Sequence, residues 1–180
     1  MSTIRPQDFY QLIGESAVQF EEICYQMENC ADRVLRLNGL DRKAMRQVVL
    51  SGLTADPLQR MLRALLAEHF KGKGYENILR SSFLGFENVT KERNSIIHGK
   101  WVVPIDEEQW RIDRQHVLSR RLKTSKSGDD AVFLRYSEED FSVFINECFR
   151  LQRVFSHLSF LCSWPDLAEN YFDKSTGKNI

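Results

Sequence analysis

The 180-residue sequence predicts a mainly α-helical protein, a four- to five-helix up-and-down bundle with a β-hairpin or three-stranded insertion near residues 100–136. Three observations support this prediction. Apolar residues recur at three- and four-residue spacings along most of the chain, as on one face of an amphipathic helix. Residue types that end helices, such as Asn–Gly and Gly, separate these stretches. Between residues 100 and 136 the pattern changes to short β-branched or aromatic runs, which favour strands.

The first part of the chain contains two helical regions. The first region covers about residues 6–37, because Pro suits the first turn of a helix and an Asn–Gly pair follows as a stop. The second region covers about residues 41–70 and begins at Asp41, whose side chain suits an N-cap. Gly52 and Pro57 are expected to divide this second region into a short helix and a longer one.

The remaining elements follow from the same patterns. The third helix covers about residues 75–98, and Gly99 is expected to supply the left-handed residue that often follows a helix. Strand-like runs come next, at residues 101–105, 110–113, 117–118 and 131–136. Ser137 with Asp140 is close to a capping box and begins a last helix, which ends at Trp164.

Composition favours one folded domain over residues 1–172, with a flexible tail over residues 173–180. Apolar residues make up 42% of the chain and charged residues 28%, as in ordinary globular domains. The 25 Lys and Arg balance 25 Asp and Glu, which argues against a protein that coats nucleic acid or membrane through bulk charge. No apolar run approaches the roughly 18 residues of a membrane span, and the first residues lack the layout of a signal peptide. We therefore expect no membrane partner.

The cysteines and glycines exclude several common kinds of site. The four Cys residues form no C-x-x-C pair and are too sparse for a disulfide scaffold, which indicates a reducing, cytoplasmic compartment. The sequence contains no dinucleotide-binding, phosphate-loop, H-E-x-x-H or G-x-S-x-G motif and no zinc-type spacing of Cys and His. We therefore expect neither a metal nor a cofactor.

The most informative segment is residues 91–101, which place Arg93, Asn94 and His98 at a predicted helix end. Asn94 and His98 are four residues apart and share a helix face, and the long Arg93 side chain can swing toward the same rim. Arginine stays charged and binds phosphate oxygens through two parallel hydrogen bonds, whereas histidine titrates near neutrality. This set suits chemistry on a phosphodiester. His98 would act as general acid or base, Arg93 would stabilise charge on phosphorus, and Asn94 would support the site.

A structural interpretation stands beside the chemical one. Cationic side chains in a last helical turn complement the partial negative charge at the helix C-terminus, so Arg93 and His98 could serve the helix alone. Trp101 and Trp110 also allow two roles, because they can stack on bases or pack the β insertion against the helices. Spacing leaves these alternatives open.

The Arg93-Asn94-x-x-x-His98 run, followed by Gly99 and Trp101, resembles the R-x4–6-H motif of the HEPN superfamily in its R-N-x-x-x-H form. The resemblance implies an all-α up-and-down bundle that is usually a homodimer. Many members of the superfamily are metal-independent endoribonucleases, in which two copies of the motif form one composite site across the dimer. For this chain the resemblance implies attack of an RNA 2′-OH on phosphorus, with Arg93 on the phosphate, His98 as acid and base, and Asn94 in support.

Basic residues follow the motif along the chain. Residues 91–126 hold nine Lys and Arg against five Asp and Glu, as an RNA-binding surface requires, although a solvated hairpin explains this charge equally well. The residues expected to bind RNA are Lys91, Lys100, Arg120, Arg121 and Lys123.

The resemblance also suggests a biological role, since such proteins often act as toxins or in antiviral defence. A regulatory or antitoxin protein is then an expected partner, together with RNA and a second copy of the chain. Two other functions stay open. The first is a non-catalytic HEPN-like module that binds RNA, a nucleotide or a protein, and the second is a structural subunit in which the motif is accidental.

Overall fold

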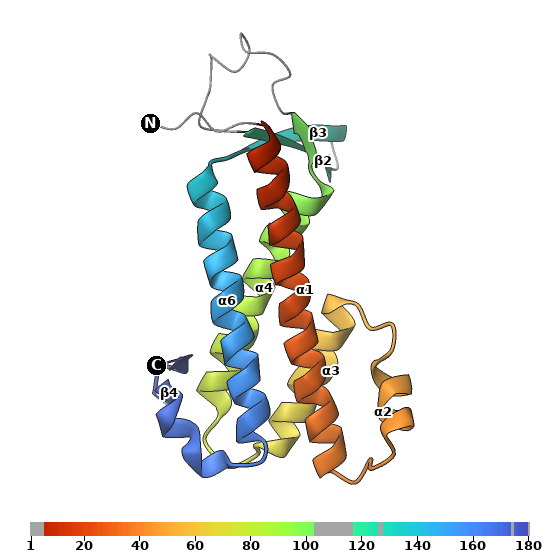
Figure 1. The fold of residues 1–180 in the computed structure, drawn as a ribbon, viewed down its shortest axis with the longest axis vertical. Coiled ribbons are helices and arrows are strands. Elements are labelled where there is room, and N and C mark those ends of the chain that lie inside the picture. The colour runs from red at the N-terminus through yellow and green to blue at the C-terminus, as the bar shows by residue number, and fades with distance from the viewer. Residues whose placement is uncertain (1–5, 103–116, 126–127, 174, 180) are drawn as a thin grey trace. The chain divides into compact units, whose positions relative to one another are not determined.

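The computed structural model describes residues 6–102, 117–125, 128–173 and 175–179, in two compact units. Met1–Phe20 and Val89–Glu147 form the unit that contains a three-stranded sheet, called the sheet unit here. Glu21–Asn88 and Cys148–Ile180 form the second, called the helical unit. Three long helices, α1 (Pro6–Leu37), α4 (Glu76–His98) and α6 (Glu138–Leu161), each contribute residues to both units (Figure 1).

The shorter elements are β1 (Lys100–Val102), β2 (Val117–Ser125) and β3 (Gly128–Tyr136) in the sheet unit, and α2 (Lys43–Leu50), α3 (Ala55–His69), η1 (Pro165–Asn170), β4 (Phe172–Asp173) and β5 (Lys178–Asn179) in the helical unit. The prediction of a mainly α-helical bundle fold with a small β insertion is therefore confirmed. The predicted strand at residues 110–113 lies outside the described residues. Within the described ranges, no helix combines the length and the apolar character that crossing a membrane requires.

An aromatic cluster fastens the sheet to the helices of the sheet unit. Strand β2 pairs antiparallel with both β1 and β3, with Trp101 opposite Ser119 and Val117 opposite Tyr136. The Trp101 ring centroid lies 5.2 Å from that of Tyr136 and 5.8 Å from that of Phe141 on α6. The Trp101 indole N–H donates to the Ile96 carbonyl at 2.8 Å. Trp101 thus has the packing role that the sequence left as one of two alternatives.

The predicted capping box at the start of α6 is present. The Ser137 backbone N–H donates to Asp140 Oδ2 at 2.7 Å, and the Asp140 N–H donates to Ser137 Oγ at 3.2 Å. These reciprocal bonds satisfy backbone donors that a helix start leaves without intrahelical partners. The strand-to-helix transition after Tyr136 is therefore encoded locally.

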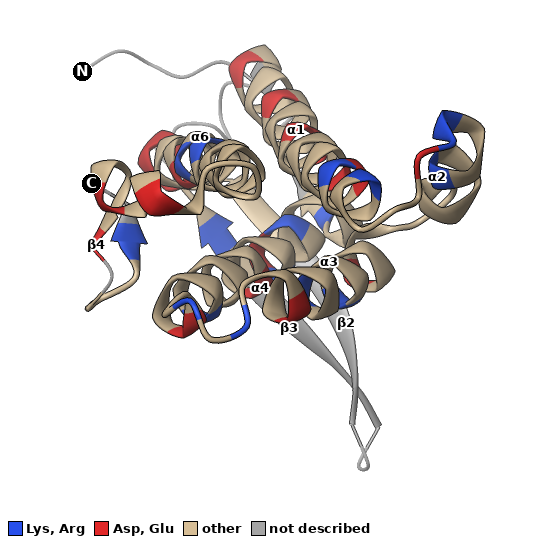
Figure 2. Ribbon diagram, turned by 90° about the horizontal axis from the view of Figure 1, so that it is seen from below, with Lys and Arg blue, Asp and Glu red and all other residues tan. Residues whose placement is uncertain are grey.

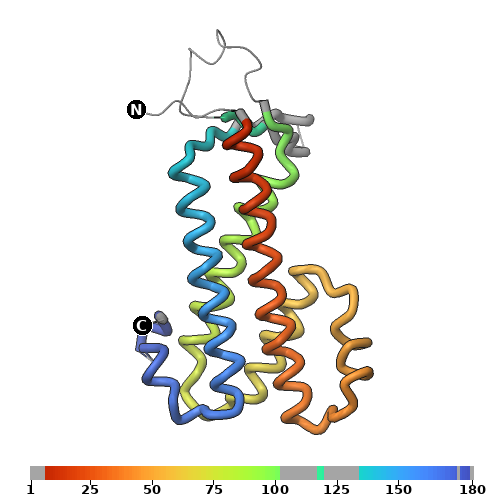
Figure 3. The backbone as a smooth tube through the Cα atoms, viewed as in Figure 1, coloured from red at the N-terminus to blue at the C-terminus, as the bar shows by residue number. Residues whose placement is uncertain are grey.

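The helical unit is built on buried aromatic side chains. The ring centroid of Phe155 on α6 lies 5.7 Å from that of Phe83 and 6.0 Å from that of Phe86, both on α4. All three side chains are buried. After α1 the chain reverses into α2 and reverses again into α3 (Figure 3). The buried apolar residues of α3, Leu58, Leu62 and Leu66, recur at four-residue spacings on one face of the helix.

Helix α2 is attached to α1 by a buried arginine. Arg46 is 6% exposed, and its Nε donates to Asp32 Oδ1 of α1 at 2.7 Å. Its Nη1 donates to the carbonyls of Leu40 and Asp41 at 2.9 and 2.8 Å. The expected N-cap role of Asp41 is wrong, because the residue before α2 is Arg42 and no side chain caps this helix start.

Three further boundaries differ from the sequence-based expectation. Helix α3 begins at Ala55, so Pro57 lies in its first turn, where proline is tolerated, rather than at a break. Gly99 does not have a positive φ, so it is not a left-handed cap. Within the segment expected to form a flexible tail, Phe172–Asp173 pairs antiparallel with Lys178–Asn179. The Asp173 carboxylate accepts hydrogen bonds from the Ser175 backbone and hydroxyl at 2.8 and 2.7 Å, which closes this hairpin.

Because of Tyr75, we expect the stability of the helical unit to fall at alkaline pH. Its hydroxyl donates to the Pro165 carbonyl at 2.6 Å, and burial, followed by nearby Cys162 and Asp166, raises the pKa of Tyr75 to about 12. The pKa of tyrosine in the unfolded chain is about 10. The protonated Tyr75 therefore stabilises the folded state fully below about pH 10, and this stabilisation is lost as the pH rises towards about 12. We expect thermal unfolding of Tyr75→Phe to depend less on pH over this window than that of the wild type. Equal alkaline losses of Tm in both proteins would contradict this.

Candidate functional site

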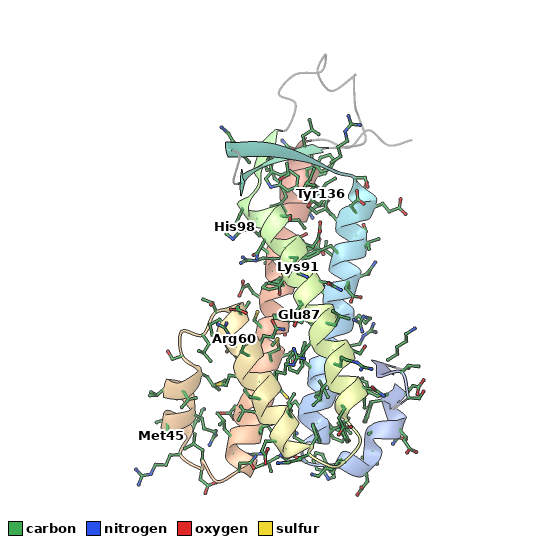
Figure 4. The ribbon with its side chains drawn as sticks, turned by 180° about the vertical axis from the view of Figure 1, so that it is seen from behind. Met45, Arg60, Glu87, Lys91, His98 and Tyr136 are labelled. Atoms are coloured by element: carbon green, nitrogen blue, oxygen red, sulfur yellow. The ribbon has the colours of Figure 1, made fainter. Side chains whose placement is uncertain are left out.

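The candidate site lies at the C-terminal end of α4, in the sheet unit. Residues 89–98 belong to this end of the helix, and Gly99 joins them to β1. Figure 4 shows Lys91 and His98 on α4, with His98 at the end of the helix from which the chain enters the sheet. The motif therefore sits at a helix end, as the sequence predicted.

The Arg93 side chain is held in place by its neighbours. It is partly buried, and its guanidinium carbon lies 5.1 Å from the centroid of the Phe20 ring, within the range of a cation–π interaction. Its Nη1 donates to the Asn94 side-chain oxygen at 3.3 Å. The structure thus brings Arg93 and Asn94 together and restricts the guanidinium before any ligand binds.

His98 is placed differently. It is the last residue of α4 and is exposed to solvent. Among the described residues, no hydrogen bond or ring contact joins it to Arg93 or Asn94. The sequence predicts that Arg93, Asn94 and His98 face the same rim of the helix. Within one chain, Arg93 and His98 do not lie together. The reason is geometric, because five residues advance an α-helix by about 140° beyond a full turn.

Tyr136 lies beside the motif, a position that the sequence pattern does not predict. Tyr136, at the end of β3, is buried, and its hydroxyl contacts the side chains of Glu92 and Ser95 on α4. Burial, followed by the hydrogen bond to the Glu92 carboxylate, raises the pKa of Tyr136 well above its usual range. The phenol therefore stays protonated and links β3 to the helix turn that carries Arg93. The contact joins residues that are far apart in the sequence, so no local pattern indicates it.

Gly99 is required for close packing and not, as the sequence predicts, for a left-handed backbone conformation. A Cβ at this position would overlap the Ser119 hydroxyl of β2 and would approach the Ser95 carbonyl to 2.8 Å. Ser119 is buried, and its hydroxyl donates to that same carbonyl at 3.5 Å. The absence of a side chain at Gly99 lets β2 lie directly against the end of α4.

Gly99→Ala is expected to destabilise the protein by about 1–3 kcal/mol, the usual cost of overpacking, because either Ser119 or the helix end must shift. Ser119→Gly removes the nearest overlapping atom, so the double variant should recover part of this loss. Chemical denaturation of both single variants and the double variant measures the coupling. Strictly additive effects would show that the two residues do not meet as described.

The expected RNA-binding residues are only partly described. Lys91 and Lys100 are exposed, at the end of α4 and the start of β1. Arg120, Arg121 and Lys123 lie on β2, with Arg120 opposite Lys100 in the strand register, and their side chains lie outside the described part of the structure. The backbone therefore places two of these basic positions next to each other at the end of the motif helix.

Other histidines have structural contacts in the helical unit. A ring nitrogen of His69 lies 3.0 Å from the Cys162 carbonyl, so that nitrogen carries the proton and donates. The His157 ring centroid lies 4.5 Å from that of Tyr171. Within the described ranges, no group of three or more His, Cys, Asp or Glu side chains is arranged to hold a metal ion.

Comparison of the chain with protein-family models, with curated protein sequences and with solved structures finds no match. The geometry at the end of α4, together with the motif that this helix carries, is therefore the feature that indicates a function.

Proposed function

We propose that the protein is a metal-independent endoribonuclease of the HEPN type, with Arg93 and His98 as its catalytic residues and Asn94 as a positioning residue. One observation carries the proposal. The R-N-x-x-x-H run lies at a helix end, with a restrained guanidinium at Arg93 and an exposed imidazole at His98.

The environment of Arg93 suits the binding of a phosphodiester. A guanidinium presents its N–H donors in a planar fork that matches the oxygens of a phosphate, and the bond of Arg93 to Asn94 fixes the direction of that fork. Restraint by the Phe20 ring reduces the side-chain entropy lost when a phosphate binds. Preorganised donors that meet developing charge account for a large share of catalysis in many enzymes.

The separation of Arg93 and His98 on the helix favours a site built from two chains. Within one chain the two residues lie about 140° apart around the helix axis, so they do not form one cluster. A second copy that docks at the end of α4 would bring its own Arg93 and His98 to the same phosphate. A homodimer is therefore part of the proposal.

The reaction follows from the roles of these groups. One imidazole takes the proton from a ribose 2′-OH, and the 2′ oxygen attacks phosphorus as the bond to the 5′ oxygen breaks. An imidazolium returns a proton to the leaving 5′ oxygen, and Arg93 stabilises the charge that develops on the phosphate oxygens. The products are a 2′,3′-cyclic phosphate and a 5′-hydroxyl. No step in this sequence consumes water or a redox partner.

A non-catalytic binding module is the second candidate. The contact of Arg93 with Phe20 favours it, because an arginine that packs against an intrachain ring can serve the fold while it also grips a ligand. The two candidates differ in turnover. The module would bind RNA without cleaving it, and the loss of His98 would not alter any chemical step.

Arg93→Lys tests the catalytic role of Arg93 without removing its positive charge. Lysine keeps the cation over Phe20 but lacks the planar fork that binds two phosphate oxygens. We expect RNA cleavage in EDTA to fall by about 10²-fold or more, with Tm unchanged, whereas Arg60→Lys at an exposed surface ion pair leaves the rate unaltered. Cleavage by Arg93→Lys at the wild-type rate would contradict the assignment of Arg93.

A further inference from the structure

The helical unit contains a polar pocket of about 470 Å³, lined by side chains of α1 and α6. Its lining includes Gln26, Asn29, Arg33, Arg36, Ser159 and Phe160. We propose that this α1–α6 pocket binds a small phosphomonoester that carries a planar ring, the chemical class of the nucleoside monophosphates. The inference does not depend on RNA cleavage, because none of these residues belongs to the candidate site on α4.

The pocket is lined by one face of α1 and one face of α6. On α1 the residues at 26, 29, 33 and 36 recur at spacings of three and four, so they share one helix face. On α6, Ser156, Ser159 and Phe160 recur in the same way and line the same hollow. A volume of about 470 Å³ falls within the range of pockets that hold small organic ligands.

The charge of the pocket favours an anion. Arg33 and Arg36 both line it, and no ion pair engages either of them among the described residues. The carboxylate in the lining, Asp32, is paired with Arg46 at 2.7 Å, so a positive charge already faces it. Figure 2 shows basic ribbon segments at the end of α1. Two arginines that share one hollow match a phosphate group, which their planar forks bind through paired hydrogen bonds.

The remaining lining supplies hydrogen bonds and a flat apolar surface. Ser159 is 8% exposed, and its hydroxyl has no hydrogen-bond partner among the described residues. A buried hydroxyl that opens into a hollow is expected to bond to whatever fills it. The Phe160 ring lines the hollow and offers an aromatic surface for a ligand ring, and its centroid lies 4.6 Å from that of Trp164, which supports it from outside the lining.

A helix-end role for the arginines is the competing explanation. Arg36 lies in the last turn of α1, where a cation complements the partial negative charge of the helix C-terminus. That role does not require the hollow, the second arginine, the buried Ser159 hydroxyl or the Phe160 ring. A phosphate-bearing ligand accounts for all four features together.

Calorimetric titration of the full chain tests the proposal with four probes, AMP, ribose 5-phosphate, adenosine and inorganic phosphate. We expect AMP to bind most tightly, because only AMP engages both the arginines and the ring surface. The variant Arg33→Lys/Arg36→Lys keeps the charge but loses the forks, and its affinity for AMP should fall at least tenfold. Phe160→Leu should weaken AMP and leave ribose 5-phosphate unaffected.

The matched control is Arg60→Lys/Arg80→Lys, which alters two exposed arginines of the same unit outside the pocket and should bind AMP as the wild type does. Thermal unfolding of each variant verifies that it is folded. Absence of AMP binding to the wild type, or equal affinity for AMP and inorganic phosphate, would overturn the proposal. Unchanged affinity in the double pocket variant would also overturn it. None of these readouts involves RNA cleavage, so failure here is separate from failure of the proposed function.

Discussion

Replacing His98 with alanine is expected to lower the rate of RNA cleavage by about 10²–10⁴-fold, the usual contribution of a general acid or base. The side chain is exposed at the end of α4, so its removal deletes no core contact. The free energy of unfolding should therefore stay within about 0.5 kcal/mol of the wild-type value, as for most surface substitutions. Single-turnover cleavage in EDTA, together with denaturant unfolding, measures both quantities.

Lys71→Ala is the control, because Lys71 is an exposed basic residue just beyond the end of α3 and lies in the helical unit, away from the candidate site. Its cleavage rate should equal that of the wild type. Added imidazole should restore part of the activity of His98→Ala, since a free base can occupy the space left by the side chain. Equal rates for wild type and His98→Ala would remove His98 from the mechanism.

Phe155→Ala is expected to cause the largest loss of stability, about 3–5 kcal/mol, as for other buried phenylalanines. The Phe155 side chain is fully buried and its ring packs between Phe83 and Phe86, so truncation leaves a cavity lined by two aromatic rings. For a chain of this size the loss corresponds to about 2–4 °C in Tm per kcal/mol. Urea unfolding followed by circular dichroism measures it.

Phe149→Ala provides the comparison on the same helix. Phe149 is 42% exposed, so its removal should cost much less than removal of Phe155. If both substitutions lower the unfolding free energy equally, the buried aromatic packing described for the helical unit is wrong.

Much of the fold could be predicted because its determinants are local. The apolar spacing of residues 6–37, 75–98 and 137–164 predicts one buried face on each long helix, and the structure has helices over nearly these ranges. The Ser137 capping box could be recognised because both partners lie within one helical turn. The β insertion was visible because the apolar period changed near residue 100.

Features that depend on distant residues could not be predicted. Gly99 was assigned a left-handed conformation, whereas its actual constraint is the approach of Ser119 from β2. Arg46 gave no sequence signal, because its role depends on Asp32 in another helix. In the candidate site, the motif residues were identified by spacing, but the contact of Arg93 with Phe20 and of Tyr136 with Glu92 required the tertiary structure.

The chemistry of the RNA ends tests the central claim most directly. Purified protein is incubated with RNA in EDTA, and the termini of the products are identified by mass spectrometry. The proposed mechanism predicts 2′,3′-cyclic phosphate and 5′-hydroxyl ends, and it predicts no cleavage at a linkage whose attacking 2′-OH has been replaced by hydrogen. Products with 3′-hydroxyl and 5′-phosphate ends, or cleavage of the 2′-deoxy linkage, would contradict 2′-OH attack at the Arg93 and His98 site.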